Sequence, residues 1–233
     1  MKGIKVVLGV VASALLLSGC NLNNTSKGGM IGAAAGGAAG TGLGAAIGAL
    51  IGGSHGAKVG AAIGAGVGVA GGTTAGVLIG KKMDKAKAQA EAIKAAQVES
   101  VQDANGLQAV KVTFDSGILF DLNSSTLKAD ARTSLTEFSN VLKSNADMDV
   151  AIFGHTDKTG TLEVNQRVSL QRAQSVQNFL KGQGVAADQL VTVEGKDYQE
   201  YDDTKSAAEN RRVEIYLYAS KEMIEAANNG TLQ

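Results

Sequence analysis

The sequence predicts an α/β (α+β) sandwich over residues 107–219, in which helices cover a mixed β-sheet. Two observations support this. Short apolar runs typical of strands, such as 110–114 and 149–153, alternate with a longer segment of helical periodicity at 162–181. Glycine and other turn-forming residues separate these runs. Strands that alternate with helices favour a sheet with helices packed on it. The chain has 233 residues, so substantial further segments accompany this domain.

The overall composition excludes several classes of function. Lys+Arg and Asp+Glu number 22 each, so the net charge gives no reason to expect nucleic acid or a polybasic membrane patch. The chain has one cysteine and therefore forms no internal disulfide. No cofactor is expected, and no sequence spacing typical of a metal site is present.

The first element is a signal peptide over residues 1–19. Two lysines lie within the first five residues, an uncharged apolar run covers 6–17, and Ser18-Gly19-Cys20 follows. The run is too short for a spanning helix, which needs about 20 residues. Leu17 to Cys20 resembles a bacterial lipobox, although an ordinary signal peptide with a chance cysteine is the alternative.

The lipobox resemblance implies cleavage before Cys20 and acylation of that residue. Attached acyl chains, palmitate among them, would anchor the protein in lipid, because each buried CH₂ contributes about 0.8 kcal/mol. Residues 20–27 would then be a lipidated N-terminus and short linker. Asn21 follows the cysteine. By resemblance to enterobacterial sorting, the lack of Asp there implies export to the outer membrane.

The second element is a regular glycine ladder over residues 28–80. Glycine occupies every fourth position from Gly28 to Gly80, and flexible linkers keep no such period. On a helix these glycines share one face and allow close backbone approach, as in membrane helix packing. A polar break at 54–58 divides the ladder. Residues 28–80 are therefore expected to form a hairpin of two glycine-zipper helices.

Two alternatives to a membrane-embedded hairpin remain open. The ladder could be a low-complexity spacer, because glycine costs about 1 kcal/mol per helical residue relative to alanine. It could also self-associate and make the protein a homo-oligomer. His55, in the polar break, is expected to be a turn residue rather than a metal ligand.

The third element, residues 81–106, is expected to be a helical spacer. Ala, Lys, Gln and Glu dominate 81–101, and Asn105-Gly106 marks a turn. Two interpretations stay open: a stalk that carries the domain off the membrane, or a helix packed on that domain. At the other end, residues 220–233 are expected to be a C-terminal tail.

Within the domain, each element has its own signal. Val110, Val112 and Phe114 alternate with polar residues, as in a half-buried strand. Ser124 and Ser125 are candidate N-caps for a helix. That helix presents an apolar face, a buried strand follows it, and a second helix runs to glycines that end it. The apolar face of the first helix consists of Leu135, Phe138 and Leu142, and the second helix covers 162–181 and ends at Gly182 and Gly184. The other expected strands are 149–153, 190–193 and 212–218, the last with Val213, Ile215 and Leu217 on one face.

One set of polar residues stands out at the predicted strand and helix ends. A Gly-His-Thr-Asp turn follows a strand, three polar residues share one face of the next helix, and Asn210-Arg211-Arg212 lies far downstream. The set consists of Gly154 to Asp157, then Asn165, Ser169 and Arg172. Together with 118–121 and the run to Glu214, this pattern resembles the OmpA-like peptidoglycan-binding domain. The resemblance covers nearly all of residues 107–219.

This resemblance implies a binding protein rather than an enzyme, with peptidoglycan as its partner. The ligand would be the diaminopimelate of the stem peptide, which exposes an ammonium and a carboxylate on one carbon. Asp157 would accept the ammonium, and the planar fork of Arg172 would hold the carboxylate. The other expected contacts come from Thr156, Asn165, Ser169, Asn210 and Arg211, while Arg212 is a weaker candidate.

The sequence departs from the family in one loop. Relatives commonly carry a second glycine and a proline before the Asn-Arg-Arg motif, whereas here Gly195 is followed by an acidic, tyrosine-bearing segment, 196–203. This loop could alter which wall chemistry is accepted. The expected function is an outer-membrane lipoprotein that tethers the membrane to the cell wall.

Three other functions compete with a tether. A catalytic triad of His155, Asp157 and Ser169 is disfavoured, because no nucleophile elbow is present. A proton-driven stator needs an intramembrane carboxylate, which residues 28–80 lack. A self-assembling zipper protein, in which wall binding is secondary, remains the alternative.

Overall fold

Five strands form one mixed sheet at the centre of the protein. The computed structural model describes residues 74–103, 106–121 and 124–233. The strand order across the sheet is β1-β2-β5-β3-β4; only β3 and β4 are parallel, and the other neighbours are antiparallel. The strands are β1 (Ala96–Gln102), β2 (Gln108–Asp115), β3 (Met148–Gly154), β4 (Leu190–Gly195) and β5 (Arg212–Ala219). The predicted mixed sheet is confirmed.

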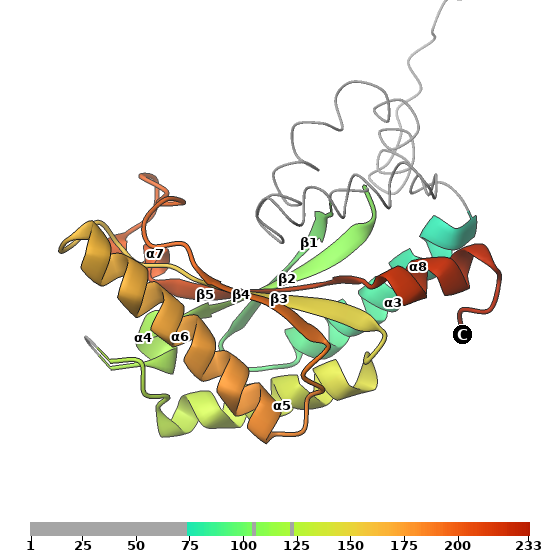
Figure 1. Cartoon of the computed structure of the whole chain (residues 1–233), viewed down its shortest axis with the longest axis horizontal. Helices are drawn as coiled ribbons and strands as arrows, with labels where there is room; N and C mark the ends of the chain where they lie inside the picture. Colours follow the sequence, from blue (N-terminus) through green and yellow to red (C-terminus); the bar gives the residue numbers. More distant parts are fainter. Residues whose placement is uncertain (1–73, 104–105, 122–123) are drawn as a thin grey trace, which may run out of the picture.

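Three long helices cover one face of this sheet (Figure 1). They bury a single apolar core with alternate residues of the central strands, as half-buried strands require. The long helices are α3 (Thr74–Glu91), α5 (Ala129–Ser144) and α6 (Leu162–Gly182), and the shorter ones are α4 (Ser116–Leu119), α7 (Ala207–Asn210) and α8 (Lys221–Asn228).

The periodicities predicted for the central elements are confirmed. The three predicted inward residues of β2, the three of β5 and the three of α5 are all 0% exposed. Phe114 of β2 meets Phe138 of α5 edge to face, with ring centroids 5.8 Å apart. Helix α6 ends at Gly182, and Gly184 follows with a positive φ of 85°.

The predicted N-cap of α5 is wrong. The helix begins at Ala129 after Lys128, which makes no side-chain cap. Ser124 instead accepts a hydrogen bond from the Thr126 amide at 3.0 Å, so its hydroxyl stabilises a turn before the helix.

The expected helical spacer over 81–106 is only partly helical. Helix α3 runs through Gly80 and Lys81 and ends at Glu91, so the expected boundary between ladder and spacer lies inside one helix. Ile79, Met83 and Ala86 are fully buried in the core. Residues 96–102 form edge strand β1, paired with β2. Between the two interpretations left open, the structure favours a helix packed on the domain over a stalk.

The expected C-terminal tail is folded as well. Helix α8 lies beside α3 (Figure 1) and buries Met223, Ile224 and Ala227. The domain therefore extends from α3 to α8, beyond the predicted limits of 107 and 219.

The signal peptide, Cys20 and the glycine ladder up to residue 73 lie outside the described residues. Within the described part of the chain, no helix has both the length and the apolar character needed to cross a bilayer.

Candidate functional site

The Gly-His-Thr-Asp turn lies where α6 crosses the ends of β3 and β4. A Cβ atom on Gly154 would lie 2.1 Å from the Ser169 carbonyl oxygen, and one on Gly195 would lie 2.4 Å from Ser169 Oγ. Both positions therefore need glycine for close approach. This contact brings the start of α6 against the strand ends, where the predicted site residues project.

Asp157 is the carboxylate of the site, and its side chain is only 10% exposed. Its Oδ1 accepts a hydrogen bond from the Thr159 amide at 2.8 Å, and its Oδ2 pairs with Arg211 Nη1. Burial alone would raise the pKa of Asp157, but the hydrogen bonds from Arg211 and Thr159 outweigh it and lower that pKa. Asp157 therefore presents a stable negative charge.

Arg172 is the buried cation of the site and is 5% exposed. Its Nε donates to the Ser124 carbonyl at 3.1 Å, and its guanidinium carbon lies 5.3 Å from the centre of the Phe120 ring. Burial lowers the pKa of Arg172, and the nearby Arg211 lowers it further, while Asp157 opposes them. Among the described residues, none accepts a hydrogen bond from Nη1 or Nη2 of Arg172, so this edge of the fork can hold an anion.

Thr156 and Asn165 lie beside these two charges. The Thr156 amide donates to the Asp197 carbonyl at 2.7 Å, while its buried Oγ1 has no partner among the described residues. Asn165 donates from Nδ2 to the Thr159 carbonyl at 3.0 Å and so holds the turn that carries Asp157. The Thr156 hydroxyl is thus a buried oxygen beside Asp157 whose hydrogen-bonding capacity the described residues leave unused.

The predicted ligand contacts of Ser169 and Asn210 are not supported, because both residues are 0% exposed. Ser169 Oγ donates to the Gln166 carbonyl at 3.0 Å and accepts from the Asp197 amide at 3.2 Å. Asn210 Oδ1 accepts from the Asp202 amide at 2.8 Å, and its Nδ2 donates to carbonyls of residues 202–206. Both side chains position the surrounding loops.

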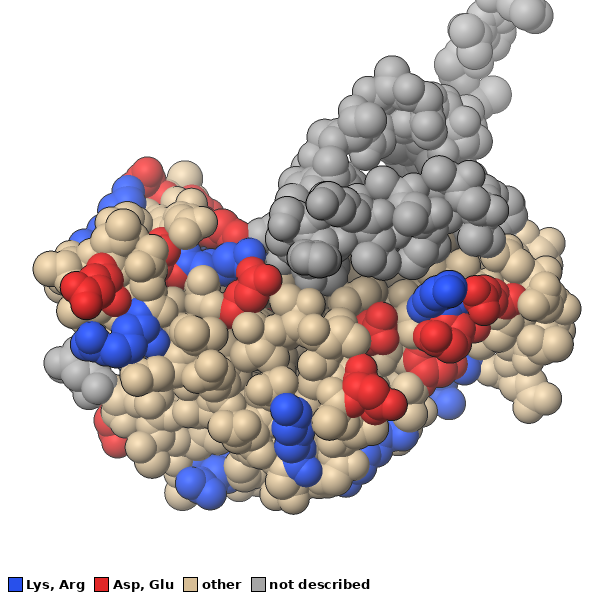
Figure 2. Space-filling model, in the orientation of Figure 1, with Lys and Arg blue, Asp and Glu red and all other residues tan. Residues whose placement is uncertain are grey.

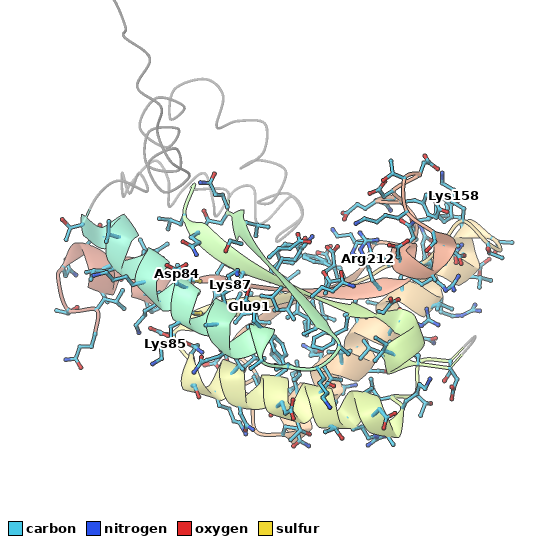
Figure 3. All side chains as sticks on the ribbon, turned by 180° about the vertical axis from the view of Figure 1, so that it is seen from behind. Asp84, Lys85, Lys87, Glu91, Lys158 and Arg212 are labelled. Atoms are coloured by element: carbon cyan, nitrogen blue, oxygen red, sulfur yellow. The ribbon has the colours of Figure 1, made fainter. Side chains whose placement is uncertain are left out.

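The two arginines after Asn210 point to different partners. Arg211 pairs with Asp157, whereas Arg212 donates from Nε to Glu214 Oε1 at 2.7 Å. In Figure 3, Arg212 lies at the start of β5 and Lys158 lies farther out on the loop after β3. Arg212 stays the weaker candidate for a direct ligand contact. The site thus gathers Asp157, Arg172 and Arg211, with one more positive than negative charge.

One cluster beside the site was missed from the sequence. His155, Glu200 and Glu214 place their ligand-type atoms within 4.8 Å of one another. His155 faces these two carboxylates rather than Asp157, and Ser169 is bonded elsewhere, so His155, Asp157 and Ser169 are not arranged as a triad. Two features of the sequence could have indicated this cluster. The acidic 196–203 loop supplies Glu200, and the alternation of side chains along β5 places Glu214 on the opposite face of the sheet from Val213.

The surface around the site carries both signs of charge. On the face seen in Figure 2, basic and acidic side chains lie interspersed near α7 and the start of α6, with no large patch of one sign. A hollow of about 390 Å³ lies elsewhere, between α3 and the C-terminal segment, and Lys82, Asp147 and Met223 are among its lining residues. That hollow contains none of the predicted site residues.

Comparison with known proteins identifies the relatives of this domain. Residues 119–214 match the model of the OmpA family. The peptidoglycan-associated lipoprotein of Pseudomonas aeruginosa is 36% identical over 119 residues, which are 50% of this chain and 67% of that protein. The probable lipoprotein YiaD of Escherichia coli K12 is 37% identical over 105 residues, 44% of this chain and 48% of that protein. Outer membrane protein A of Serratia marcescens is 32% identical over 134 residues, 51% of this chain and 37% of that protein.

Among solved structures, the cell wall anchor of the type VI secretion system from Pseudomonas aeruginosa is similar, with a TM-score of 0.46 and 25% identity. That similarity covers 61% of this chain and 97% of the other. The chain spans about a third to two thirds of the length of the first curated relatives it matches.

Proposed function

Because this chain belongs to the OmpA family, we propose that its folded domain binds peptidoglycan non-covalently and tethers the outer membrane to the cell wall. The relatives named above are envelope proteins, and the chain is not an enzyme. One of them is named for its association with peptidoglycan. The proposed partner is therefore the wall polymer on the periplasmic side of the membrane.

The observation that carries this proposal is the arrangement of Asp157 and Arg172 at one end of the sheet. Asp157 is held ionised, and one edge of the Arg172 guanidinium, next to the Phe120 ring, makes no hydrogen bond to the described part of the chain. A zwitterionic head group matches such a pair, because a carboxylate accepts two parallel hydrogen bonds from a guanidinium. Diaminopimelate in the stem peptide carries this head group.

Binding would rearrange one contact of the ligand-free site. Arg211 occupies Asp157 Oδ2, and an incoming ammonium would share or replace that contact. The side chain of Arg211 is 34% exposed, so it can move at little cost, whereas Arg172 is held by Ser124 and Phe120. The excess positive charge of the site then favours the ligand carboxylate, and the Thr156 hydroxyl supplies a neutral hydrogen bond.

Sedimentation with purified sacculi tests the proposal. Asp157→Asn and Arg172→Ala should each lose most of the protein that sediments with diaminopimelate-containing sacculi. Matched controls are Arg167→Ala, an exposed arginine on the same helix, and Asp130→Asn, an exposed carboxylate on α5, which should sediment like the parent. If the two site variants also sediment like the parent while remaining folded, the assigned site is wrong.

The ligand detail has a separate test. Walls whose stem peptides carry lysine in place of diaminopimelate lack the second carboxylate, so they give Arg172 nothing to hold. Binding to such walls should fall by at least tenfold, since charge-assisted bidentate pairs contribute well above about 1 kcal/mol. Equal binding to both wall types would leave peptidoglycan binding intact but exclude diaminopimelate as the determinant.

The membrane attachment is proposed through acylated Cys20. Cys20→Ala should move the protein out of the membrane fraction, unless the glycine ladder alone retains it there. The competing function, self-assembly through the ladder, is tested by cross-linking with and without residues 28–73. This deletion stops before α3 and therefore leaves the folded domain intact.

A further inference from the structure

Three ligand-type side chains from separate segments meet on the sheet face away from the main core. His155 follows β3, Glu214 lies on β5, and Glu200 lies on the loop after β4. His155 Nδ1 is 3.9 Å from Glu200 Oε2, and His155 Nε2 is 3.6 Å from Glu214 Oε2. These residues are brought together by the fold and not by any local sequence motif.

The imidazole of His155 is buried and makes no hydrogen bond to the residues that the structure describes. It is 1% exposed, and both Nδ1 and Nε2 lack a partner among the described residues. Buried polar atoms are paired in the great majority of cases, so two unpaired nitrogens in one ring require an explanation. Each ring nitrogen faces a different carboxylate, and both distances are too long for hydrogen bonds.

The carboxylate of Glu214 is held in place by its own neighbours. Its Oε1 accepts from Arg212 Nε and its Oε2 accepts from the Tyr216 hydroxyl, each at 2.7 Å. Hydrogen bonds of this kind orient the carboxylate ligands of metal sites. Glu200 is the adaptable member, because its side chain is 30% exposed and lies on a loop.

From these contacts we propose that His155, Glu200 and Glu214 bind one divalent transition-metal ion, with Zn²⁺ the best match. One imidazole nitrogen and two carboxylate oxygens are ligand types that zinc takes at about 2.0 to 2.2 Å. Such ligands stand about 3.3 Å apart on a tetrahedral ion, and one ligand atom of each residue here lies within 4.8 Å of the other two. An ion on Nε2 beside Glu214 needs the Glu200 carboxylate, which faces Nδ1, to rotate towards it. Water would complete the coordination.

A bound ion would have a structural consequence for the neighbouring loop. Glu200 belongs to the segment 196–203, in which Asp197 already accepts from the Thr156 amide. The ion would tie this loop to the turn that carries Asp157. The alternative occupant of the same space is a proton, with a charged imidazole between two carboxylates and no metal.

Zinc titration by calorimetry distinguishes a bound metal ion from a protonated imidazole at this cluster. The full mature chain is used in a Cys20→Ala, His55→Ala background, which leaves His155 as the sole histidine and removes the sole thiol. After treatment with a chelator, one equivalent of Zn²⁺ should bind, and Mg²⁺ at the same concentration should not. His155→Ala and Glu200→Gln should each weaken zinc binding by at least tenfold. Asp203→Asn, on the same loop, should leave it unchanged.

Nitrogen-15 NMR of the single imidazole gives an independent readout. Zinc should shift one ring nitrogen of His155 into the range of a metal-bound nitrogen. The proposal is overturned if folded protein binds no zinc, if Glu200→Gln binds it as tightly as the background, or if the ring stays a doubly protonated imidazolium at saturating zinc. Because Glu200 is on a loop, its variant remains informative even if His155→Ala fails to fold.

Discussion

Gly154 and Gly195 hold the site together by having no side chain. Each lies within contact distance of Ser169 on α6, and this contact sets the distance between the helix that carries Arg172 and the strand end that carries Asp157. The sequence suggested Gly154 as part of a motif, but its physical role became visible only once α6 was seen to cross the sheet. The same is true of Ser169, which was expected to bind ligand and instead accepts from the Asp197 amide.

Gly154→Ala should destabilise the domain. The added Cβ would lie 2.1 Å from a backbone oxygen, which cannot rotate away, so α6 must shift. Overpacking of this kind costs about 1–3 kcal/mol, measured as the free energy of unfolding in urea. Gly182→Ala is the matched control, because a Cβ at Gly182 meets nothing within 4 Å, and it should not destabilise. Equal stability of the two variants would contradict the proposed close approach.

Asp149 gives a pH dependence that can be checked separately from the site. Burial first, then the nearby Glu222 and Asp188, raise its pKa to about 6 from 3.8. Its antiparallel neighbour on β5 is Tyr218, whose pKa is also raised, by burial and then by Asp149. Because the pKa of this acid is higher in the folded state, Asp149 lowers stability fully above pH 6, and the penalty disappears as the pH falls towards 4.

Asp149→Asn should therefore stabilise the protein at pH 8 but not at pH 4. Two pKa units correspond to about 3 kcal/mol, and solvent screening at this partly exposed carboxylate reduces the expected gain to about 1 kcal/mol. Urea denaturation at both pH values measures it, with the exposed Glu137→Gln as the control. A gain of the same size at both pH values would rule out the titration of Asp149 as its cause.

At the scale of whole elements, the sequence predicted the central sheet well and its borders poorly. Strands β2, β3 and β5 carry strong apolar patterns that local reading detects. Strand β1 (Ala96–Gln102) lacks such a pattern, because it is rich in helix formers. Its pairing with β2 overrides that helical preference. Asn210 shows the same limit in the site, because its role in closing the 202–206 loop depends on contacts that no local pattern encodes.

Helix α3 is the element whose role changed most, and a substitution tests it. Ile79→Ala should cost about 2–5 kcal/mol in unfolding free energy, since Ile79 is fully buried in the main core. Val77→Ala, on the same helix but 49% exposed, should change stability by less than about 0.5 kcal/mol. If α3 were a free stalk, the two substitutions would have equally small effects on unfolding of the domain.

The described domain is only one end of the proposed tether. Its proposed wall-binding site lies at the α6–α7 end of the sheet, whereas the chain enters the domain through α3, beside α8 (Figure 1). The two lie towards opposite ends of the structure, so a wall strand bound at the site would leave the entry of the chain uncovered. This geometry suits a protein that is held at both ends at once.

A bridging assay tests whether both ends must belong to one chain. Acylated protein in liposomes should carry those liposomes down with sacculi. Cys20→Ala should still sediment with sacculi but leave the liposomes behind, and Asp157→Asn should stay with the liposomes and leave the sacculi behind. A mixture of these two variants contains both binding activities, but on separate chains. It should therefore not carry liposomes down with sacculi. Bridging by the mixture would mean that copies associate with one another, as the self-assembly function requires, and that the tether is an oligomer rather than a single chain.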